Sequence, residues 1–190
     1  MTTDILVREW SFPLSLNGTI IDLECTSIKP EDGEIVTFGV FCGNKITIYQ
    51  RTDPSESGKV AFLKKFENWK DFCIRPYFAY NKSYEEMWLK TSFDSDLMEK
   101  WKKKAENERK KWPRVSELVS MPHNYYGLSD IEGAEVPILW EEYKKTSDVQ
   151  ILDRIIHHDF YDLVREACLC LWHDSLHDDF VTVLESKIKK

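Results

Sequence analysis

Hydrophobic and polar residues alternate along the first part of the chain with the two-residue period of β-strands. Residues 5–14 alternate loosely, and the turn-forming sequence SLNG leads from them into a second apolar run, so we expect a hairpin that ends in a strand over Thr19–Glu24. Two further β-rich runs, Glu34–Phe41 and Lys45–Arg51, are separated by a tight turn signal around Gly43. The pattern therefore predicts that antiparallel strands come first.

The spacing of apolar residues changes to three and four in the later part of the chain, which is typical of helices. This spacing predicts helices over Lys59–Phe72, Ser83–Lys90, Asp94–Lys111 and Val149–Leu176, and a short apolar run over Tyr77–Tyr80 predicts a strand among them. Strands followed by mixed elements indicate an α/β three-layer domain. Its mixed sheet would have leading antiparallel strands, and a later strand would join it through a helical crossover.

The length and composition agree with one globular domain. A chain of 190 residues, 42% hydrophobic and 31% charged, can bury a core without staples, and no repeat or linker divides it, so we expect a single domain over residues 1–190. No apolar run approaches the roughly 20 residues of a membrane-spanning helix, and the N-terminus does not look like a signal peptide. The five cysteines contain no C-x-x-C pair, which argues against a disulfide framework or a zinc site. We expect a cytoplasmic protein with no membrane partner.

The formal net charge of −7 argues against a protein that coats duplex nucleic acid by bulk electrostatics. It does not argue against a nuclease, because bound metal ions neutralise the carboxylates of such a site. Lys100–Arg114 is a basic stretch within this acidic chain, with eight basic and two acidic residues. A solvated helix face and a phosphate-binding track both explain this stretch.

Two carboxylates end the apolar strand that closes at residue 24. Asp22 and Glu24 are two residues apart, so their side chains project to the same face of the strand. Like charges at one point repel unless a cation shares them, and hard divalent ions such as Mg²⁺ prefer oxygen ligands. An exposed acidic turn is the simpler explanation of a D-x-E sequence taken alone.

Two later segments add further candidates. Glu85 lies just inside a helix that follows a short strand, where it would also complement the helix dipole while Asn81 or a nearby serine caps the helix. His158 and Asp162 are four residues apart and share a helix face, whereas His157 meets the same site only if the helix starts or bends between them. A solvated helix surface would explain these side chains equally well.

Together these segments resemble the DEDD (DnaQ-like) 3′→5′ exonuclease superfamily on a ribonuclease H-like fold, and more narrowly its YprB-type branch. The resemblance lies in IIDLECTSIKPEDGEIVTFGV for motif I, AYNKSYEEMWL for motif II and IIHHDFYDLVREACLCL for motif III. Most members have aspartate where this chain has Glu85. The resemblance spans residues 18–173 in order and implies a ribonuclease H-like three-layer fold, with helices on both faces of the mixed sheet.

The resemblance also implies a two-metal mechanism with two Mg²⁺ or Mn²⁺ ions. The implied metal ligands are Asp22, Glu24, Glu85 and Asp162, with Asp22 as the bridge between the ions. His157 matches the spacing of the histidine subclass, and it would accept the proton of the attacking water. His158 stands where the other subclass has tyrosine. The implied function is 3′→5′ exonucleolytic hydrolysis of single-stranded DNA or RNA that has a free 3′ end.

Other functions stay open on this sequence. A catalytically weakened module that binds nucleic acid or protein would keep the fold while Glu85 marks decay of the site, and a structure-specific endonuclease would cut strands without an end. The sequence does not decide between DNA and RNA, whether a helicase or polymerase partner supplies the substrate, or the oligomeric state. Zinc deaminases, zinc hydrolases and glycine-rich phosphate loops are excluded because their motifs are absent.

Overall fold

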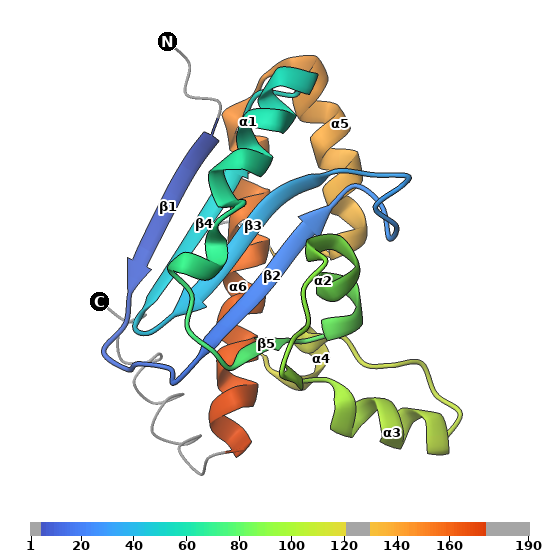
Figure 1. Cartoon of the computed structure of the whole chain (residues 1–190). Helices are drawn as coiled ribbons and strands as arrows, with labels where there is room; N and C mark the ends of the chain where they lie inside the picture. The colour runs from blue at the N-terminus through green and yellow to red at the C-terminus, as the bar shows by residue number, and fades with distance from the viewer. Residues whose placement is uncertain (1–4, 121–129, 174–190) are drawn as a thin grey trace.

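A computed structural model describes residues 5–120 and 130–173 of the chain (Figure 1). Within these residues the strands form one sheet in the spatial order β1-β4-β3-β2-β5-β6. Their bounds are β1 Ile5–Ser11, β2 Thr19–Cys25, β3 Ile35–Cys42, β4 Lys45–Arg51, β5 Tyr77–Ala79 and β6 Ser95–Asp96. Neighbours among β1, β4, β3 and β2 pair antiparallel, whereas β5 runs parallel to β2 and β6 runs parallel to β5. The sheet is therefore mixed, with leading antiparallel strands, as the sequence pattern predicts.

The predicted hairpin between the first two strands is wrong. β1 pairs with β4, with Ile5 opposite Arg51, and forms one edge of the sheet, while β2 lies between β3 and β5. The burial of the two strands explains this order. Six of the seven residues of β2 are buried, whereas none of β1 is. Because β2 is buried on both faces, it belongs in the interior of the sheet with helices above and below it.

Helices cover both faces of the sheet and complete three layers (Figure 1). On one face, Ile21 and Leu23 of β2 pack in a core cluster with Phe62 and Phe66 of α1. On the other face, Ile20 packs in a cluster with residues of α4 and α6, and α5 packs against the first half of α6. The bounds of the helices are α1 Glu56–Phe66, η1 Trp69–Asp71, α2 Lys82–Leu89, α3 Glu99–Asn107, α4 Val115–Leu118, η2 Gly133–Glu135, α5 Val136–Thr146 and α6 Val149–His173. The fold is the α/β three-layer arrangement that the sequence predicts.

Several helices differ from the expectation. The helix predicted over Lys59–Phe72 is divided into α1, which begins at Glu56 and ends at Phe66, and the short helix η1. The helix predicted over Asp94–Lys111 begins only at Glu99, because residues 95–96 first add the short strand β6 to the sheet. Asp94 accepts a hydrogen bond from the backbone N–H of Tyr77 at 2.8 Å, which ties this segment to β5 before the helix starts. α5 was not predicted at all. α6 begins at Val149 as predicted, and the expected continuation to residue 176 lies outside the described residues.

α6 is the longest of the described helices, with 25 residues. Its buried side includes Leu163, Val164 and Ala167, yet charged residues interrupt the apolar positions. Within residues 5–120 and 130–173, no helix has the combined length and apolar character required to cross a membrane.

Candidate metal centre between β2 and α6

Strand β2 places its acidic side chains on the face of the sheet that α6 covers. Ile20 packs with Ile156 of α6, and Asp22 and Glu24 follow at two-residue intervals, so all three side chains of β2 project to this face. Glu24 is only 7% exposed. The D-x-E sequence is therefore part of a buried strand and not an exposed acidic turn.

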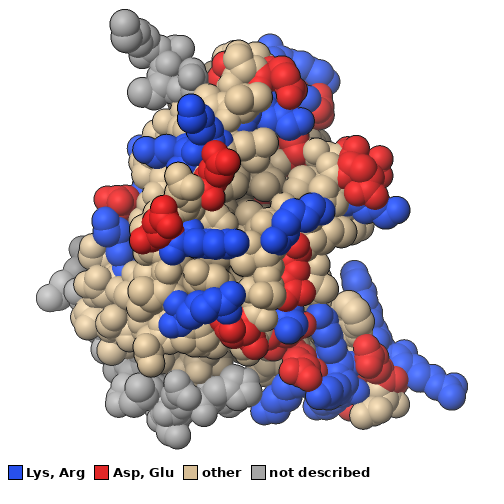
Figure 2. Space-filling model, in the orientation of Figure 1, with Lys and Arg blue, Asp and Glu red and all other residues tan. Residues whose placement is uncertain are grey.

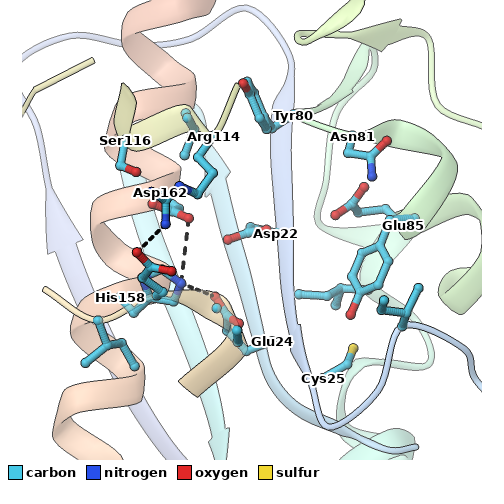
Figure 3. Close-up of a pocket in the computed structure, with 18 of the residues that line it drawn as sticks. Asp22, Glu24, Cys25, Tyr80, Asn81, Glu85, Arg114, Ser116, His158 and Asp162 are labelled. Atoms are coloured by element: carbon cyan, nitrogen blue, oxygen red, sulfur yellow. Dashed lines mark ion pairs between the residues drawn. The ribbon is translucent and has the colours of Figure 1, made fainter. Parts of the chain in front are cut away.

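Helix α6 turns a polar stripe toward these carboxylates. His158, Asp162 and Glu166 are spaced four residues apart, so they lie above one another on one face of the helix. All three line the same pocket as Asp22 and Glu24, as Figure 3 shows for the labelled residues. The pocket has a volume of about 730 Å³, which is within the range of small-molecule sites.

Helix α2 contributes the remaining sequence-predicted carboxylate. β5 runs parallel beside the start of β2, and the helix that follows β5 brings Glu85 to the other side of Asp22 from His158 and Asp162 (Figure 3). Glu85 is 4% exposed. The predicted cap by Asn81 is wrong, since its side chain makes no cap hydrogen bond and accepts instead from Lys102 at 2.8 Å.

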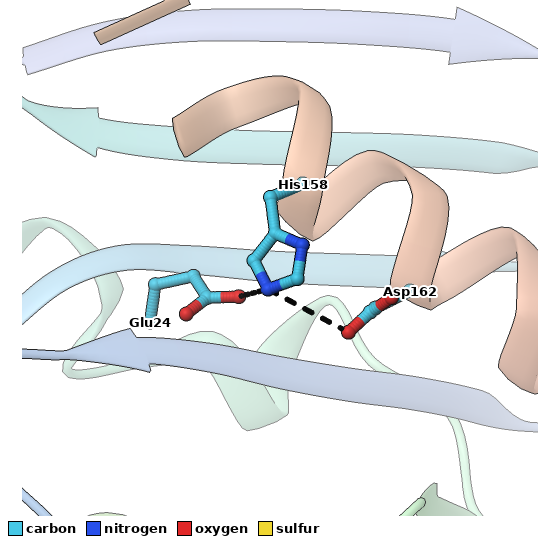
Figure 4. Close-up of side chains that lie close together, drawn as sticks. All are labelled: Glu24, His158 and Asp162. Carbon is cyan, nitrogen blue, oxygen red and sulfur yellow. Dashed lines mark ion pairs between the residues drawn. The ribbon is translucent and has the colours of Figure 1, made fainter. Parts of the chain in front are cut away.

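His158 contacts carboxylates with both ring nitrogens. Its Nε2 lies 3.3 Å from Glu24 Oε1 and 3.8 Å from Asp162 Oδ2 (Figure 4). Its Nδ1 lies 3.2 Å from Asp130 Oδ1. Arg165 donates to Asp162 and to Asp130, each at 2.6 Å. Arg165 therefore fixes two of the three carboxylates that hold the ring.

The structure does not bring His157 into the pocket. α6 continues through His157 and His158 without a start or a bend between them, so the condition for His157 to meet Asp162 is not fulfilled. Burial lowers the pKa of His157, while Asp153 raises it and Arg8 of β1 lowers it. His157 therefore faces the β1 side of the sheet, and His158 is the histidine of the pocket.

Burial raises the pKa values of four carboxyls of the pocket. Burial and then the charge of Asp162 raise the pKa of Asp22 to about 7. Burial is also the main reason that the pKa values of Glu24, Glu85 and Glu166 lie well above the ordinary glutamate range, and neighbouring carboxylates add to each shift. Without a cation, these carboxyls would therefore keep protons that exposed acids lose near pH 4.

The pKa shifts of His158 and Asp130 decide which of these two residues donates the hydrogen bond between them. Burial lowers the pKa of His158, but Glu24, Asp162 and Asp130 outweigh it and raise that pKa well above the ordinary value. Burial raises the pKa of Asp130, but hydrogen bonds from His158 and Arg165 outweigh it and lower that pKa. Asp130 is therefore an anion that accepts from Nδ1–H of His158, and Nε2 is left facing the pocket.

Buried oxygens without partners make this pocket suitable for cations. Asp22 Oδ2, Glu85 Oε2 and Glu166 Oε2 are buried and have no hydrogen-bond partner. A further set of candidate ligand atoms, all within 4.8 Å of one another, comes from Glu24, His158 and Asp162. Carboxylate oxygens suit Mg²⁺ and Mn²⁺. The donor set therefore fits the divalent ions that the sequence implies.

Sequence reasoning missed four charged residues of this region, namely Asp130, Asp159, Arg165 and Glu166. The three residues on α6 carry a signal that was available, because they continue the three- and four-residue spacing of His158 and Asp162. Asp130 carries no local signal. Its partner Arg165 is 35 residues away along the chain.

Asp159 lies behind the pocket and not in its lining. It is fully buried, and it approaches β3 so closely that a Cβ added at Gly39 would stand 2.1 Å from its Oδ1. Gly39 is the partner of Asp22 in the sheet. The missing side chain at position 39 therefore provides the space for a second buried carboxylate beside Asp22.

Basic residues border the pocket on the side of α3 and α4. Lys111 and Arg114 line it, and Arg114 also pairs with Glu117 at 3.3 Å and with Glu132. Figure 2 shows the Lys and Arg side chains that gather over α3 next to this border. The predicted basic stretch is therefore adjacent to the carboxylates, which the sequence alone did not indicate.

The aromatic residues around motif II pack mainly into the core. Tyr84 and Trp88 are half-buried against the cluster beneath α1, with ring centroids 6.3 Å apart. Tyr80 packs against the α6 cluster, and its hydroxyl donates to the carbonyl of Pro113 at 2.6 Å. These contacts make the three aromatic side chains part of the packing between the sheet and its helices.

Comparison with known proteins gives one match. A family model described as the RNase_H superfamily matches residues 19–173. No significant match to a curated protein or to a solved structure was found. The matched range covers β2 through α6, so it includes every residue of the pocket and leaves out only the edge strand β1 among the described strands.

Proposed function

The chain belongs to the RNase H superfamily, and from this membership and the geometry of the pocket we propose that it is a metal-dependent 3′→5′ exonuclease acting on single-stranded nucleic acid. Members of this superfamily are typically hydrolytic nucleases that use divalent metals. The observation that supports the proposal most is the gathering of acids from three elements around Asp22. The pocket-lining acids on β2, α2 and α6 are Asp22, Glu24, Glu85, Asp162 and Glu166, and a further lining acid, Glu132, pairs with Arg114.

The carboxylates fit two Mg²⁺ or Mn²⁺ ions. When bound, such ions activate a water for in-line attack and stabilise the leaving 3′-oxygen. Asp22 is the best candidate to bridge them, because it stands between Glu85 on one side and Asp162 on the other (Figure 3). The negative charge of the metal-free pocket would repel a phosphodiester, so the substrate can enter only after cations neutralise it.

His158 is the residue that we assign to proton transfer. Its Nε2 faces the pocket, and Asp130 accepts from Nδ1 and so fixes the ring orientation. In its neutral form, Nε2 accepts a proton from the water while the water oxygen bonds to phosphorus and the bond from phosphorus to the 3′-oxygen breaks. The products are a nucleoside 5′-monophosphate and a strand shortened by one nucleotide.

Lys111 and Arg114 are the candidates for contacts with the phosphates of the strand. Both line the pocket, and the basic stretch continues from them along α3. Cations along a groove bind a single strand through its backbone without sequence preference. A strand with its 3′ end at the carboxylates would therefore leave the pocket along α3.

Hydrolysis of end-labelled strands tests this function. Single-stranded DNA and RNA, labelled at the 3′ or the 5′ end, are incubated with Mg²⁺ or Mn²⁺ and sampled over time beside a closed circular strand and an EDTA control. We expect stepwise shortening of the 5′-labelled strand, early release of the 3′ label, an intact circle and no reaction with EDTA. Cleavage of the circle would establish an endonuclease. Binding without hydrolysis, or hydrolysis that EDTA does not stop, would contradict the proposal and favour a binding module in the first case.

Glutamine replacements at the two neighbouring histidines distinguish the proton acceptor. His158→Gln is expected to lower kcat on the order of 10²-fold, the lower end of what general base catalysis contributes, while His157→Gln leaves kcat near the wild-type value. Single-turnover hydrolysis at saturating Mn²⁺ measures both. An equal loss in the two variants, or a larger loss for His157→Gln, would remove His158 from this role.

A further inference from the structure

Glu166 lines the pocket but is not one of the four carboxylates that the sequence resemblance implies as metal ligands. It lies one helical turn after Asp162 on α6, is 2% exposed and lines the pocket. Its Oε2 is buried and has no hydrogen-bond partner. A buried ionised carboxylate without a partner is costly, so the side chain requires either a proton or a cation.

The neighbours of Glu166 indicate what this partner is. Burial and then the charges of Asp22 and Glu85 raise the pKa of Glu166. Asp22 Oδ2 and Glu85 Oε2 are themselves buried without hydrogen-bond partners. Three unpartnered carboxylate oxygens from β2, α2 and α6 thus border the same pocket, and hard divalent cations bind this kind of donor set.

The cluster of Glu24, His158 and Asp162 shares no residue with these three acids. Its ligand atoms lie within 4.8 Å of one another, and none of them comes from Asp22, Glu85 or Glu166. Arg165, the cation that neighbours Glu166 in sequence, is bonded to Asp162 and Asp130. Beside this cluster, the pocket therefore has three further acids, each with a buried oxygen that lacks a hydrogen-bond partner.

We propose that Glu166 is a fifth carboxylate ligand, which with Asp22 and Glu85 holds a divalent cation beside the position formed by Glu24 and Asp162. This assignment rests on the proposed metal-dependent function and adds to it a ligand on α6.

Mn²⁺ binding to the intact chain tests the assignment without reference to activity. Calorimetric titration gives the affinities, and electron paramagnetic resonance of free Mn²⁺ counts the bound ions. We expect two ions for the wild type. Loss of an outer-shell partner alone costs about 10–100-fold in metal affinity, so Glu166→Gln should weaken one of the two ions by at least about 100-fold. The other ion should remain bound.

Asp159→Asn is the matched control. Like Glu166, Asp159 is a buried acid of α6 whose oxygens lack hydrogen-bond partners, but it lies behind the pocket against Gly39 and does not line it. The replacement therefore removes the same charge without removing a residue of the pocket lining. We expect both ions to bind this variant within roughly tenfold of wild-type affinity. Circular dichroism confirms folding, and if Glu166→Gln does not fold, Glu166→Asp takes its place, with weakened binding of the same ion as the expected result.

Three results would overturn the assignment. The first is that Glu166→Gln binds both ions with wild-type affinity. The second is that Glu166→Gln and Asp159→Asn lose metal affinity equally, and the third is that the wild type binds only one ion. These results are independent of the nuclease assay. If two ions bind but no strand is hydrolysed, the proposed function is refuted and Glu166 remains a ligand. If hydrolysis depends on metal but Glu166→Gln binds both ions as the wild type does, the proposed function stands and Glu166 is not a ligand.

Discussion

Replacement of Asp22 by asparagine is expected to lower metal-dependent hydrolysis by about 1,000-fold or more, because several kcal/mol of stabilisation by the ions corresponds to a rate factor of this size. Asp22 stands between Glu85 and the acids of α6 (Figure 3), and asparagine keeps its shape while removing the charge that a bridging ligand needs. Burial and repulsion by Asp162 raise the pKa of Asp22 to about 7. The neutral variant escapes this cost, so its metal-free form should be at least as stable as the wild type.

The measurement is the initial rate of hydrolysis of a 5′-labelled strand, together with the Tm of each variant in EDTA. Asp153→Asn is the control, since it makes the same charge change on α6 at a half-exposed residue whose partner is Arg8, 3.7 Å away. We expect this control to hydrolyse the strand at close to the wild-type rate. An Asp22→Asn variant that keeps more than about a tenth of the wild-type rate would show that Asp22 is not a metal bridge.

The pairing of two strands could be predicted from the sequence where a short turn connects them directly. β3 and β4 end and begin within one residue of the predicted runs, because Gly43 adopts a positive φ of 58° between them and forms a short hairpin turn. The partner of β1 could not be predicted in this way. It pairs with β4, whose position at that side of the sheet follows from the burial of β2 and not from any turn next to β1.

The periodicity of strands and helices accounts for most of the candidate site. The two-residue period places Asp22 and Glu24 together, and the four-residue period places His158 and Asp162 together. The choice between His157 and His158 required the knowledge that α6 is continuous, which periodicity does not give. Asp130 could not be found at all, because only the tertiary fold brings it to His158 and Arg165.

Asp159 and Gly39 show a further limit of the sequence. A buried acid that approaches a glycine of another element has no pattern of its own, since the clash that a Cβ would cause exists only in the packed structure. The same holds for the two cation positions that we propose. Sequence spacing supplies the acids, and the relative positions of β2, α2 and α6 decide which of them face the same part of the pocket.

The metal-free protein is expected to lose stability between pH 5 and 7.5. When the pKa of a carboxyl is higher in the folded protein than in the unfolded chain, the folded state binds more protons. The stabilisation that this carboxyl gives to the folded state is complete below the unfolded pKa. It is lost as the pH rises through the folded pKa. For Asp22 this window extends from 3.8 to about 7. The upward shifts of Glu24, Glu85 and Glu166 have the same sign.

His157 opposes this trend, because burial lowers its pKa and the unfolded state therefore binds more protons than the folded state as the pH approaches the ordinary histidine value. The other titrating groups do not reverse the trend, and His157 does not either, because one histidine acts against several raised carboxyls. The raised pKa of His158 also means that its stabilising effect is lost as the pH rises. The pKa values of Glu34 and Asp130 are lowered, so their stabilisation is complete above the unfolded values and does not change from pH 5 upward. A net change of about 2 kcal/mol corresponds to roughly 5 °C in a chain of this size, and we expect the Tm in EDTA to fall by at least that much.

Divalent cations should remove this fall, because they bind the ionised carboxylates of the folded state and so lower the pKa values that burial raises. The measurement is the Tm from pH 5 to 7.5, once in EDTA and once in 5 mM Mn²⁺, a concentration on the order of 100 times a dissociation constant of about 50 μM. We expect the Tm in Mn²⁺ to exceed the Tm in EDTA by several degrees at pH 7.5 and by less at pH 5. Asp22→Asn should show a smaller fall in EDTA than the wild type. A Tm in EDTA that is constant or rises over this range would mean that the acids of the pocket already have partners, and the pocket would then need no cation to be stable at neutral pH.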